Sequence, residues 1–148
     1  MLLSKEVTVE LHLTGHKIKR YFASMLKQQN IPLTPEQFML IDILWNQGEM
    51  SQQQLAAHMQ KDKNSVTMLV DGLEQKGLIV RKQNAHDRRS NTMILTDKAH
   101  AMKEEAKQKG ISILDTILSG IDEEELQSFL GTLRKLNRNM DIVINSEE

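Results

Sequence analysis

The chain has 148 residues, of which 39% are hydrophobic and 26% charged, and it carries a formal net charge of -1. These values exclude a disordered or collagen-like chain and fit one folded domain, which at this length buries about 70% of its unfolded surface. Cysteine is absent from the sequence, so disulfides, thiolate metal sites and thiol redox switches are excluded.

The hydrophobic residues occur in short runs. The longest unbroken runs, such as residues 38–41, cover only a few positions, whereas a helix that crosses a bilayer needs about 20. The first residues, MLLSKEV, place a lysine and a glutamate where a secretory leader would need its apolar core. We therefore expect a cytoplasmic protein with no membrane partner.

The near-neutral total, which argues against a nucleic-acid binder, hides an uneven distribution of charge. Residues 1–50, 51–100 and 101–148 carry net charges of 0, +3 and -4. Within residues 76–89, a single acidic residue, Asp87, stands against the basic residues Lys76, Arg81, Lys82, Arg88 and Arg89. The middle of the chain therefore predicts a local cationic patch.

Two helices are predicted in the first third of the chain. Apolar residues at spacings of three and four predict a first helix of roughly 25 residues that ends before Pro32. Thr34, Pro35 and Gln37 then form the capping-box start of a second helix, which ends at Gly48. This second helix is apolar almost all round, so we expect it to be central.

Two shorter helices follow at close spacing. Ser51 to Gln54 repeats the capping-box pattern before a helix of about eight residues. After a turn of a few residues, Asp62 caps a further helix that Gly77 ends. Two helices this short and this close predict a helix-turn-helix.

The second half of the chain is predicted to hold a hairpin and two long helices. Residues 78–80 and 92–95 are β-prone runs on either side of a polar stretch, which is typical of a hairpin with a long tip. Thr96 caps a helix that extends to about Ile121, and Asp122 with Glu125 begins a last helix by a capping box.

The predicted fold class follows from this order of elements. It is mainly α with a small β-hairpin wing: a winged helix-turn-helix flanked by long dimerisation helices. The DNA-binding region covers residues 34–96, and the helical dimerisation region covers residues 1–33 and 97–148, within a single intertwined domain.

The helix capped by Asp62 has one face suited to DNA. Its buried stripe is Val66, Leu69, Val70 and Leu73, and the opposite face is short-chained and mostly uncharged. Such a face fits the major groove, where Asn bonds adenine and Thr or Met contacts a thymine methyl. The residues predicted to contact bases or phosphates are Ser51, Gln53, Lys61, Lys63, Asn64, Thr67 and Met68. The alternative is a merely solvated helix face.

The tip of the predicted hairpin carries two adjacent arginines, Arg88 and Arg89, beside Asp87. An arginine at such a tip can enter a narrow minor groove, whose negative potential attracts it. Asp87 is predicted to orient a guanidinium, and Arg81 to support the wing. A charge run is usually only solvated surface, but one that follows a helix-turn-helix favours DNA.

Four stretches, LTPEQFMLIDIL, SQQQLAAHM, NSVTMLVDGLEQKGLIVRK and HDRRSNTMILTDKA, together resemble the multiple antibiotic resistance regulator (MarR) family of bacterial transcription factors. The resemblance covers about residues 34–100. It implies a homodimeric regulator, most often a repressor, whose recognition helices and wings read a pseudo-palindromic operator. It also implies release from DNA by a small-molecule effector, often an aromatic acid.

The resemblance assigns roles to individual residues. It implies base or phosphate contacts for Asn64, Ser65 and Thr67, and a wing-arginine role for Arg89 with Asp87 as its support. Two residues depart from the family's pattern. Met68 stands where arginine is common, and Ala99 stands where a glycine commonly follows the Leu-Thr of the second wing strand.

A homodimer is also predicted from the residues themselves. The last two helices carry more apolar surface than one neighbour would cover, and two reading heads combine their contacts on one DNA site. The predicted dimer residues are Ile113, Leu114, Ile117, Leu118, Leu133, Met140 and Val143. The alternative is that these side chains form a core within one subunit.

The resemblance further implies an effector crevice. Plausible lining residues provide a cation for a carboxylate and aromatic walls: His16, Arg20, Tyr21, Phe38 and Trp45. The alternative is that Phe38 and Trp45 are plain core.

Metal and enzyme chemistry are not predicted. His12 and His16 are four residues apart but lack a recognisable third ligand, so we expect neither a metal nor another cofactor. The sequence shows no nucleophile elbow, phosphate loop or paired-carboxylate pattern, so we expect no enzyme. The alternative function is a winged-helix protein–protein interaction module without sequence-specific DNA binding.

Overall fold

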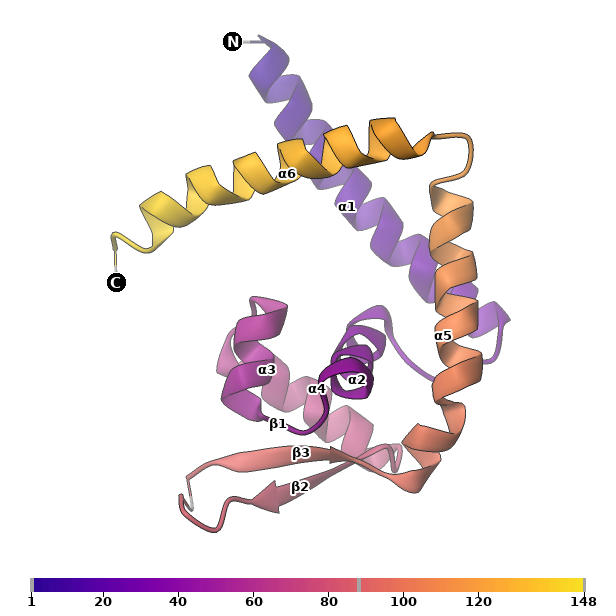
Figure 1. The fold of residues 1–148 in the computed structure, drawn as a ribbon, viewed down its shortest axis with the longest axis vertical. Coiled ribbons are helices and arrows are strands. Elements are labelled where there is room, and N and C mark those ends of the chain that lie inside the picture. The colour runs from indigo at the N-terminus through magenta and orange to yellow at the C-terminus, as the bar shows by residue number, and fades with distance from the viewer. Residues whose placement is uncertain (1, 88, 148) are drawn as a thin grey trace. The chain divides into compact units, whose positions relative to one another are not determined.

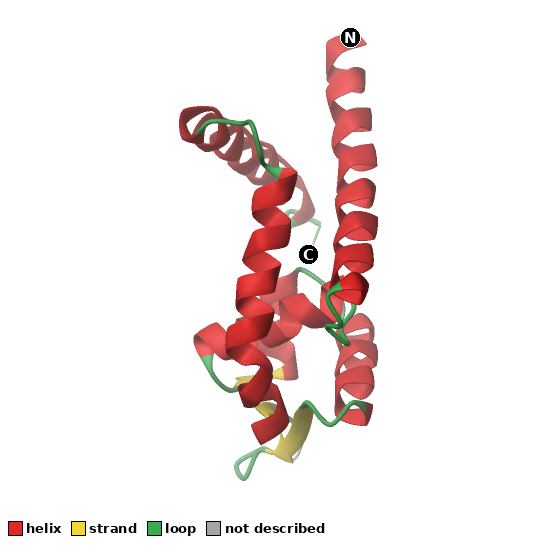
Figure 2. Cartoon of the chain, turned by 90° about the vertical axis from the view of Figure 1, so that its right-hand side faces the viewer, coloured by secondary structure: helices red, strands yellow, loops and turns green. Residues whose placement is uncertain are grey.

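The computed structural model describes residues 2–87 and 89–147 and is mainly helical, with a small antiparallel sheet (Figures 1 and 2). In chain order the elements are α1 (Leu2–Gln28), α2 (Pro35–Gln47), β1 (Met50–Ser51), α3 (Gln52–Met59), α4 (Lys63–Gln75), β2 (Ile79–Gln83), β3 (Asn91–Leu95), α5 (Asp97–Ile117) and α6 (Glu123–Ile144). The predicted fold class is confirmed. None of the described helices is long and apolar enough to cross a membrane.

The starts of α2 and α3 are the predicted capping boxes. Thr34 Oγ1 accepts from the N–H of Gln37, while Gln37 Oε1 accepts from the N–H of Thr34, at 3.2 and 3.1 Å. Ser51 and Gln54 make the same reciprocal pair at 3.1 and 2.9 Å. Each pair satisfies two backbone donors that a helix start leaves open. Local sequence therefore determines where both helices begin.

The turn between α3 and α4 is short and sharply defined. Gln60 adopts the left-handed conformation, with φ of 52°, at the end of α3. Asp62 Oδ1 accepts from the N–H of Ser65 at 2.7 Å and so caps α4, as predicted. At the other end of α4, Gly77 has φ of 73°, a conformation that favours glycine after a helix. The helix-turn-helix is thus delimited by its own capping residues.

The sheet differs from the predicted hairpin. In the part of the chain that the structure describes it has three strands, in the order β1-β3-β2. β2 and β3 pair from Ile79 opposite Leu95 to Gln83 opposite Asn91, and Met50 in β1 pairs with Met93 in β3. A two-residue strand has too few positions to show an alternating pattern, so β1 was not predictable from periodicity.

The core of the winged helix joins α2, α3 and α4 to the sheet (Figure 1). Its fully buried side chains are Leu40, Ile41, Leu55, Val66, Val70, Leu73, Leu78, Ile79 and Met93. The predicted buried stripe of α4 is confirmed except at Leu69, which is only partly buried. This core holds α4 in place from behind and leaves its opposite face to solvent.

The described residues form two compact units, one up to Ile113 and one from Leu114 onward. α1 and most of α5 therefore group with the winged helix, and α6 lies in the second unit. α5 ends at Ile117, earlier than predicted, because Gly120 at φ of 81° closes a tight turn after it. Asp122 Oδ1 accepts from the N–H of Glu125 at 2.8 Å and so caps α6. This is the side-chain-to-N3 hydrogen bond of the predicted capping box.

Candidate nucleic-acid interface

The outward face of α4 begins at the first turn of the helix. Lys63 and Asn64 are exposed there, and Met68 follows one turn later with 75% of its surface exposed. A helix N-terminus carries partial positive charge and free N–H groups, which favour phosphate. The predicted reading residues Lys63, Asn64 and Met68 are therefore brought together on one accessible surface.

Two predicted DNA contacts use their hydroxyl groups inside the protein. Thr67 Oγ1 donates to the carbonyl of Lys63 at 2.9 Å and accepts a hydrogen bond from Gln52 Nε2 of α3. Ser65 Oγ donates to Asp62 Oδ2 at 3.1 Å. These bonds fix the two helices of the motif to each other and stabilise the start of α4. In this arrangement Thr67 and Ser65 position the reading surface, because their hydroxyls are already engaged.

The start of α3 retains donors for a phosphate. Ser51 Oγ accepts the cap bond from the N–H of Gln54, which leaves its own proton available to donate. Gln53, in the first turn of α3, is exposed. Ser51 and Gln53 therefore have donors that are available for the predicted contacts to DNA phosphates.

Lys61, in the turn between α3 and α4, contacts a carboxylate of α2. Its Nζ lies 3.5 Å from Glu36 Oε1 of α2, and Lys19 Nζ of α1 lies 2.5 Å from the same oxygen. The Lys19 hydrogen bond is the largest cause that holds the pKa of Glu36 below its usual value. A phosphate at Lys61 would therefore compete with Glu36, whereas Lys63 has no such neighbour among the described ion pairs.

Asp62, the cap of α4, is held in its charged form. The backbone N–H of Ser65 is the first cause that lowers the pKa of Asp62, followed by the Ser65 hydroxyl. The carboxylate thus accepts from both donors at the helix start. This acceptor fixes the turn that presents Lys63 and Asn64.

Arg81 joins the wing to α4. Its guanidinium lies 2.6 Å from Asp71 Oδ1 and 3.2 Å from Glu74 Oε1, and it also donates to the carbonyl of Thr67 at 3.5 Å. All three partners belong to α4, whereas Arg81 lies in β2. The base of the wing and the reading helix are thereby tied together by one side chain.

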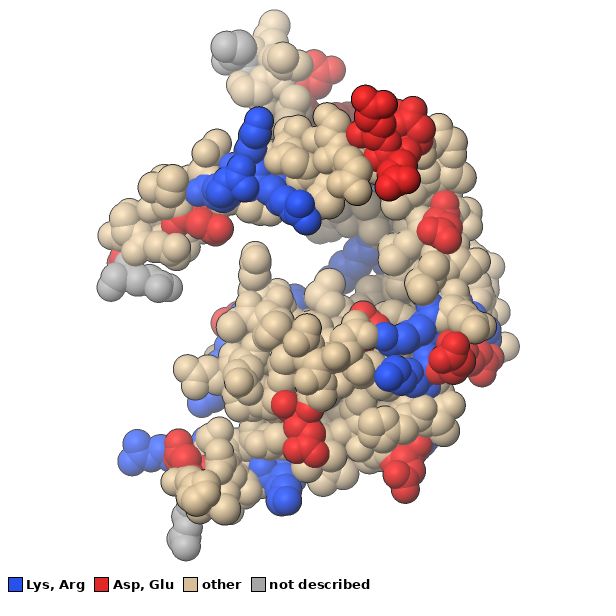
Figure 3. All heavy atoms as spheres, viewed as in Figure 1, with Lys and Arg blue, Asp and Glu red and all other residues tan. Residues whose placement is uncertain are grey.

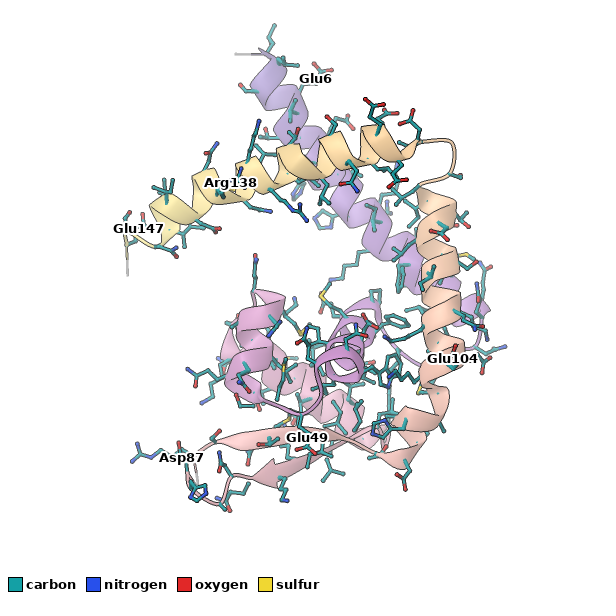
Figure 4. The ribbon with its side chains drawn as sticks, in the orientation of Figure 1. Glu6, Glu49, Asp87, Glu104, Arg138 and Glu147 are labelled. Carbon is teal, nitrogen blue, oxygen red and sulfur yellow. The ribbon has the colours of Figure 1, made fainter. Side chains whose placement is uncertain are left out.

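The tip of the wing is organised by Asp87, labelled at the end of the hairpin in Figure 4. Asp87 Oδ1 accepts from the backbone N–H of Arg89 at 2.9 Å, and its carbonyl accepts from the N–H of Ser90 at 3.1 Å. The sequence predicted that Asp87 orients a guanidinium, but the contact is to the main chain of Arg89. The Arg89 side chain is exposed. Arg88 lies outside the described residues.

The cationic patch predicted between residues 76 and 89 is smaller than its sequence indicates. Lys76 Nζ donates to Gln37 Oε1 at 2.6 Å and to the carbonyl of Pro32 at 2.9 Å, so it holds α4 against the start of α2. Arg81 is likewise paired. On the face drawn in Figure 3, basic and acidic side chains are interspersed at the bottom of the view, where β2 and β3 lie in Figure 1. Lys82 and Arg89 are the described cations of this stretch that remain exposed.

The predicted effector residues separate into two groups. Phe38 packs edge-on against Phe22 and Trp45, with ring centroids 5.5 and 6.2 Å apart, and Trp45 Nε1 donates to the carbonyl of Ala99 at 3.2 Å. Phe22 and Trp45 are buried, whereas Phe38 is only partly buried, so the alternative of plain core fits Trp45 better than Phe38. His16 and Arg20 are exposed on α1, and Tyr21 is partly buried.

The two histidines of α1 lie close to each other. The ring centroids of His12 and His16 are 4.6 Å apart, with the rings nearly perpendicular. Among the residues that the structure describes, no group of three or more His, Cys, Asp or Glu is placed to hold a metal ion. Among these described residues, His12 and His16 therefore have no third protein ligand for a metal ion.

The predicted dimer residues are mostly accessible, with one exception. Ile113 is only 1% exposed and belongs to the core of the first unit, so its assignment to a dimer surface is wrong. Its position on the inner side of α5 could not be distinguished from the outer side by hydrophobicity alone. Leu114, Leu118, Met140 and Val143 are exposed, while Ile117 and Leu133 are partly buried.

Further apolar side chains are exposed beyond that set. They include Leu2, Leu3, Val7, Val9, Leu13 and Ile18 of α1, and Phe129, Leu130, Ile142 and Ile144 of α6. The sequence placed the first helix in the dimerisation region but assigned none of its residues to the dimer contact.

The fold and this site define a winged-helix protein with a solvent-exposed reading helix. Residues 33–90 match the MarR family. The HTH-type transcriptional repressor MdtR of Bacillus subtilis (strain 168) is 30% identical over 124 residues, which cover 84% of this chain and 79% of that protein. The chain belongs to the MarR family and is a DNA-binding transcriptional regulator. Its relatives are named as regulators, which points away from an enzyme.

Solved structures share the fold. The organohalide-sensing transcriptional regulator RdhR-CbdbA1625 in its 2,4-dichlorophenol-bound form has a TM-score of 0.85 and 24% identity, over 95% of this chain and 83% of that one. Reduced AbfR bound to DNA has a TM-score of 0.77 and 19% identity, over 95% of each chain.

Proposed function

We propose that this regulator is a homodimeric repressor that reads a pseudo-palindromic operator, with α4 in the major groove and Arg89 in the minor groove. The observation that carries the proposal is the joint presentation of Asn64 and Met68 on α4 and of Arg89 on a wing that Arg81 ties to the same helix. One rigid unit would then bring two reading elements to adjacent grooves.

The composition of α6 supports the homodimer. The structure describes the whole of α6, and none of its residues is buried, although it carries a stripe of apolar side chains. Apolar surface of this extent is typical of an interaction site. A second copy of the same chain is the occupant that a two-fold operator requires, since each head alone makes only a few contacts.

Repression and effector release are supported by relatives. MdtR is named as a repressor, and RdhR-CbdbA1625 was solved with 2,4-dichlorophenol bound. We extend both properties to this chain, with a small aromatic acid as the effector class. Arg20 and His16 would meet its carboxylate, and Tyr21 its ring, beside the aromatic cluster of Phe38 and Trp45. The protein would act in the bacterial cytoplasm.

The wing contact is tested by Arg89→Ala on a duplex selected from a random library. We expect binding to weaken by about 1–3 kcal/mol at fixed salt, because one groove contact is lost while the fold is kept. Fluorescence anisotropy measures the affinity. Arg138→Ala, which removes the same charge from α6, is the control and should bind as the wild type does. Equal affinities for the Arg89 variant and the wild type would contradict the minor-groove role.

The salt dependence of binding separates this function from a protein-interaction module. Phosphate contacts release counterions, so affinity for a mixed-sequence duplex should fall steeply as salt rises. A flat response, or no binding at low salt, would favour the interaction module.

The effector is tested by titrating aromatic carboxylic acids into the operator complex. An acid that binds the free protein more tightly than the DNA-bound form must lower operator affinity, by linkage. It should also raise the melting temperature of the free protein. If no acid shifts either quantity, release by this class of effector is ruled out.

A further inference from the structure

We propose that Met68 is a specificity-determining residue that contacts the C5-methyl group of a thymine in each half-site of the operator. The inference rests on the proposed function, because it assumes that α4 enters the major groove. It deepens that function by assigning one base pair of the operator to one side chain.

Met68 is the most exposed large apolar side chain that the structure describes between residues 35 and 95, at 75%. The winged-helix core does not use it, since the buried side of α4 is formed by Val66, Val70 and Leu73. A single exposed methionine is ordinary on a protein surface. Its place on the second turn of the reading helix is what distinguishes it.

The polar neighbours of Met68 are already engaged. The Thr67 hydroxyl bonds to Lys63 and Gln52, the Ser65 hydroxyl bonds to Asp62, and the Asp71 carboxylate is paired with Arg81. Among the described side-chain hydrogen bonds and ion pairs of α4, none involves the side chains of Lys63 or Asn64. Over the first two turns of α4, the accessible reading surface therefore reduces to a cation, a carboxamide and a thioether.

The chemistry of that surface selects its base partners. A cation reads phosphate or guanine, and a carboxamide reads adenine through N6 and N7. A thioether has no strong donor or acceptor, so its favourable major-groove contact is the thymine methyl, the apolar group that the bases present there. The flexible side chain of methionine also adapts to such a methyl group.

The helix geometry places this thymine relative to the Asn64 contact. Asn64 and Met68 are four residues apart on one face, which corresponds to about 6 Å along the helix axis. Base pairs are stacked about 3.4 Å apart, and a recognition helix is inclined to the DNA axis, so the two side chains meet base pairs no more than about two steps apart. We expect each half-site to contain a T·A pair within about two steps of the pair that Asn64 reads.

The test removes the methyl group alone. A duplex selected from a random library is resynthesised with each thymine in turn replaced by deoxyuridine, at equivalent positions of both half-sites. At one position the wild type should lose about fourfold in affinity per half-site, the value of one buried methyl-sized group, and about 15-fold for both. Met68→Ala should bind the thymine and uracil duplexes equally.

Two variants control for a merely structural role. Met68→Leu keeps an apolar side chain and should retain discrimination at the same position. Met39→Ala removes an exposed methionine of α2, which is 52% exposed, and should discriminate as the wild type does. A variant that only disturbs α4 would weaken binding to both duplexes by the same factor.

The outcomes separate the two proposals. If the wild type selects a specific duplex but no thymine responds to loss of its methyl group, the role of Met68 is overturned and the DNA-reading function stands. Discrimination that persists in Met68→Ala also overturns it. If no duplex is selected at all, the proposed operator function fails and the role of Met68 fails with it.

Discussion

α4 and α6 are both amphipathic helices, but the apolar face of α4 is buried and that of α6 is exposed. In α4 the stripe of Val66, Val70 and Leu73 is completely buried under α2, α3 and the sheet. In α6 a stripe of similar spacing, which includes Phe129 and Met140, is exposed, and no residue of this helix is buried. Amphipathic spacing therefore identifies an apolar face but not the surface that covers it.

The two parts of the molecule are therefore stabilised in different ways. The reading helix is held by contacts within its own unit, so its outer face has a defined shape before DNA is present. α6 gains little from burial within one chain, since apolar surface stabilises only when it leaves water. Its stability in the proposed dimer would depend on the partner and thus on protein concentration.

The largest expected effect comes from truncating the covered stripe. Leu73→Ala removes a side chain that is 0% exposed and leaves a cavity behind α4. We expect it to lower the free energy of unfolding by about 2–5 kcal/mol. Chemical denaturation at a fixed protein concentration measures this change.

The matched truncation on α6 is Leu130→Ala, at a side chain that is 39% exposed. Its effect should be absent at protein concentrations well below the dimer dissociation constant and appear as the concentration rises above it, because the lost contact lies between copies. A loss at Leu130 that equals that at Leu73 and does not depend on concentration would break the comparison between the two helices.

A smaller effect is expected from placing a charge on the uncovered stripe. Met140→Glu puts a carboxylate where the dimer would bury apolar surface, which should weaken self-association by about 30-fold or more, as at a binding hot spot. Sedimentation equilibrium measures the dissociation constant. Ser128→Glu adds the same charge about 120° around α6 from Met140, at about 100° per residue, and should weaken self-association much less. Equal effects of the two variants would argue against this face as the interface.

A weaker contribution is expected from Lys19 with Glu36, the described ion pair that joins α1 to α2. The Lys19 contact lowers the pKa of Glu36 below its ordinary value of 4.5, so the pair stabilises the fold at neutral pH. This contribution should be lost as the pH falls below 4.5 and through the lowered pKa of the folded state. Because the pair is partly exposed, we expect less than about 1 kcal/mol.

Glu36→Gln checks this prediction by thermal unfolding. The difference between the variant and the wild type should be present at pH 7, vanish at acidic pH and shrink in about 1 M salt, where charges are screened within about 3 Å. A difference that persists unchanged at acidic pH would show that the carboxylate acts by packing or hydrogen bonding alone.

The starts of the helices were predictable because capping is a local interaction. Thr34, Ser51 and Asp62 each bond to an N–H three residues ahead, and such pairs are visible in the sequence. The contacts from Gln52 to Thr67 and from Arg81 to Asp71 were not predictable, since they join residues 15 and 10 positions apart through the fold. The sequence also predicted more unpaired positive charge near the wing than the structure has, because Lys76 and Arg81 bond to residues distant in the chain.

Local sequence was enough to predict the order and type of the main elements, the helix starts at their capping residues, and the resemblance to the family. These properties depend on local hydrogen bonding and on periodic burial, which neighbouring residues specify. Packing across the fold was needed to show that Ile113 is core, that Thr67 and Arg81 are bonded within the protein, and that Met68 is exposed. Those outcomes depend on which side chains meet across the fold, and the same residue type serves as core, support or reading surface according to what lies opposite it.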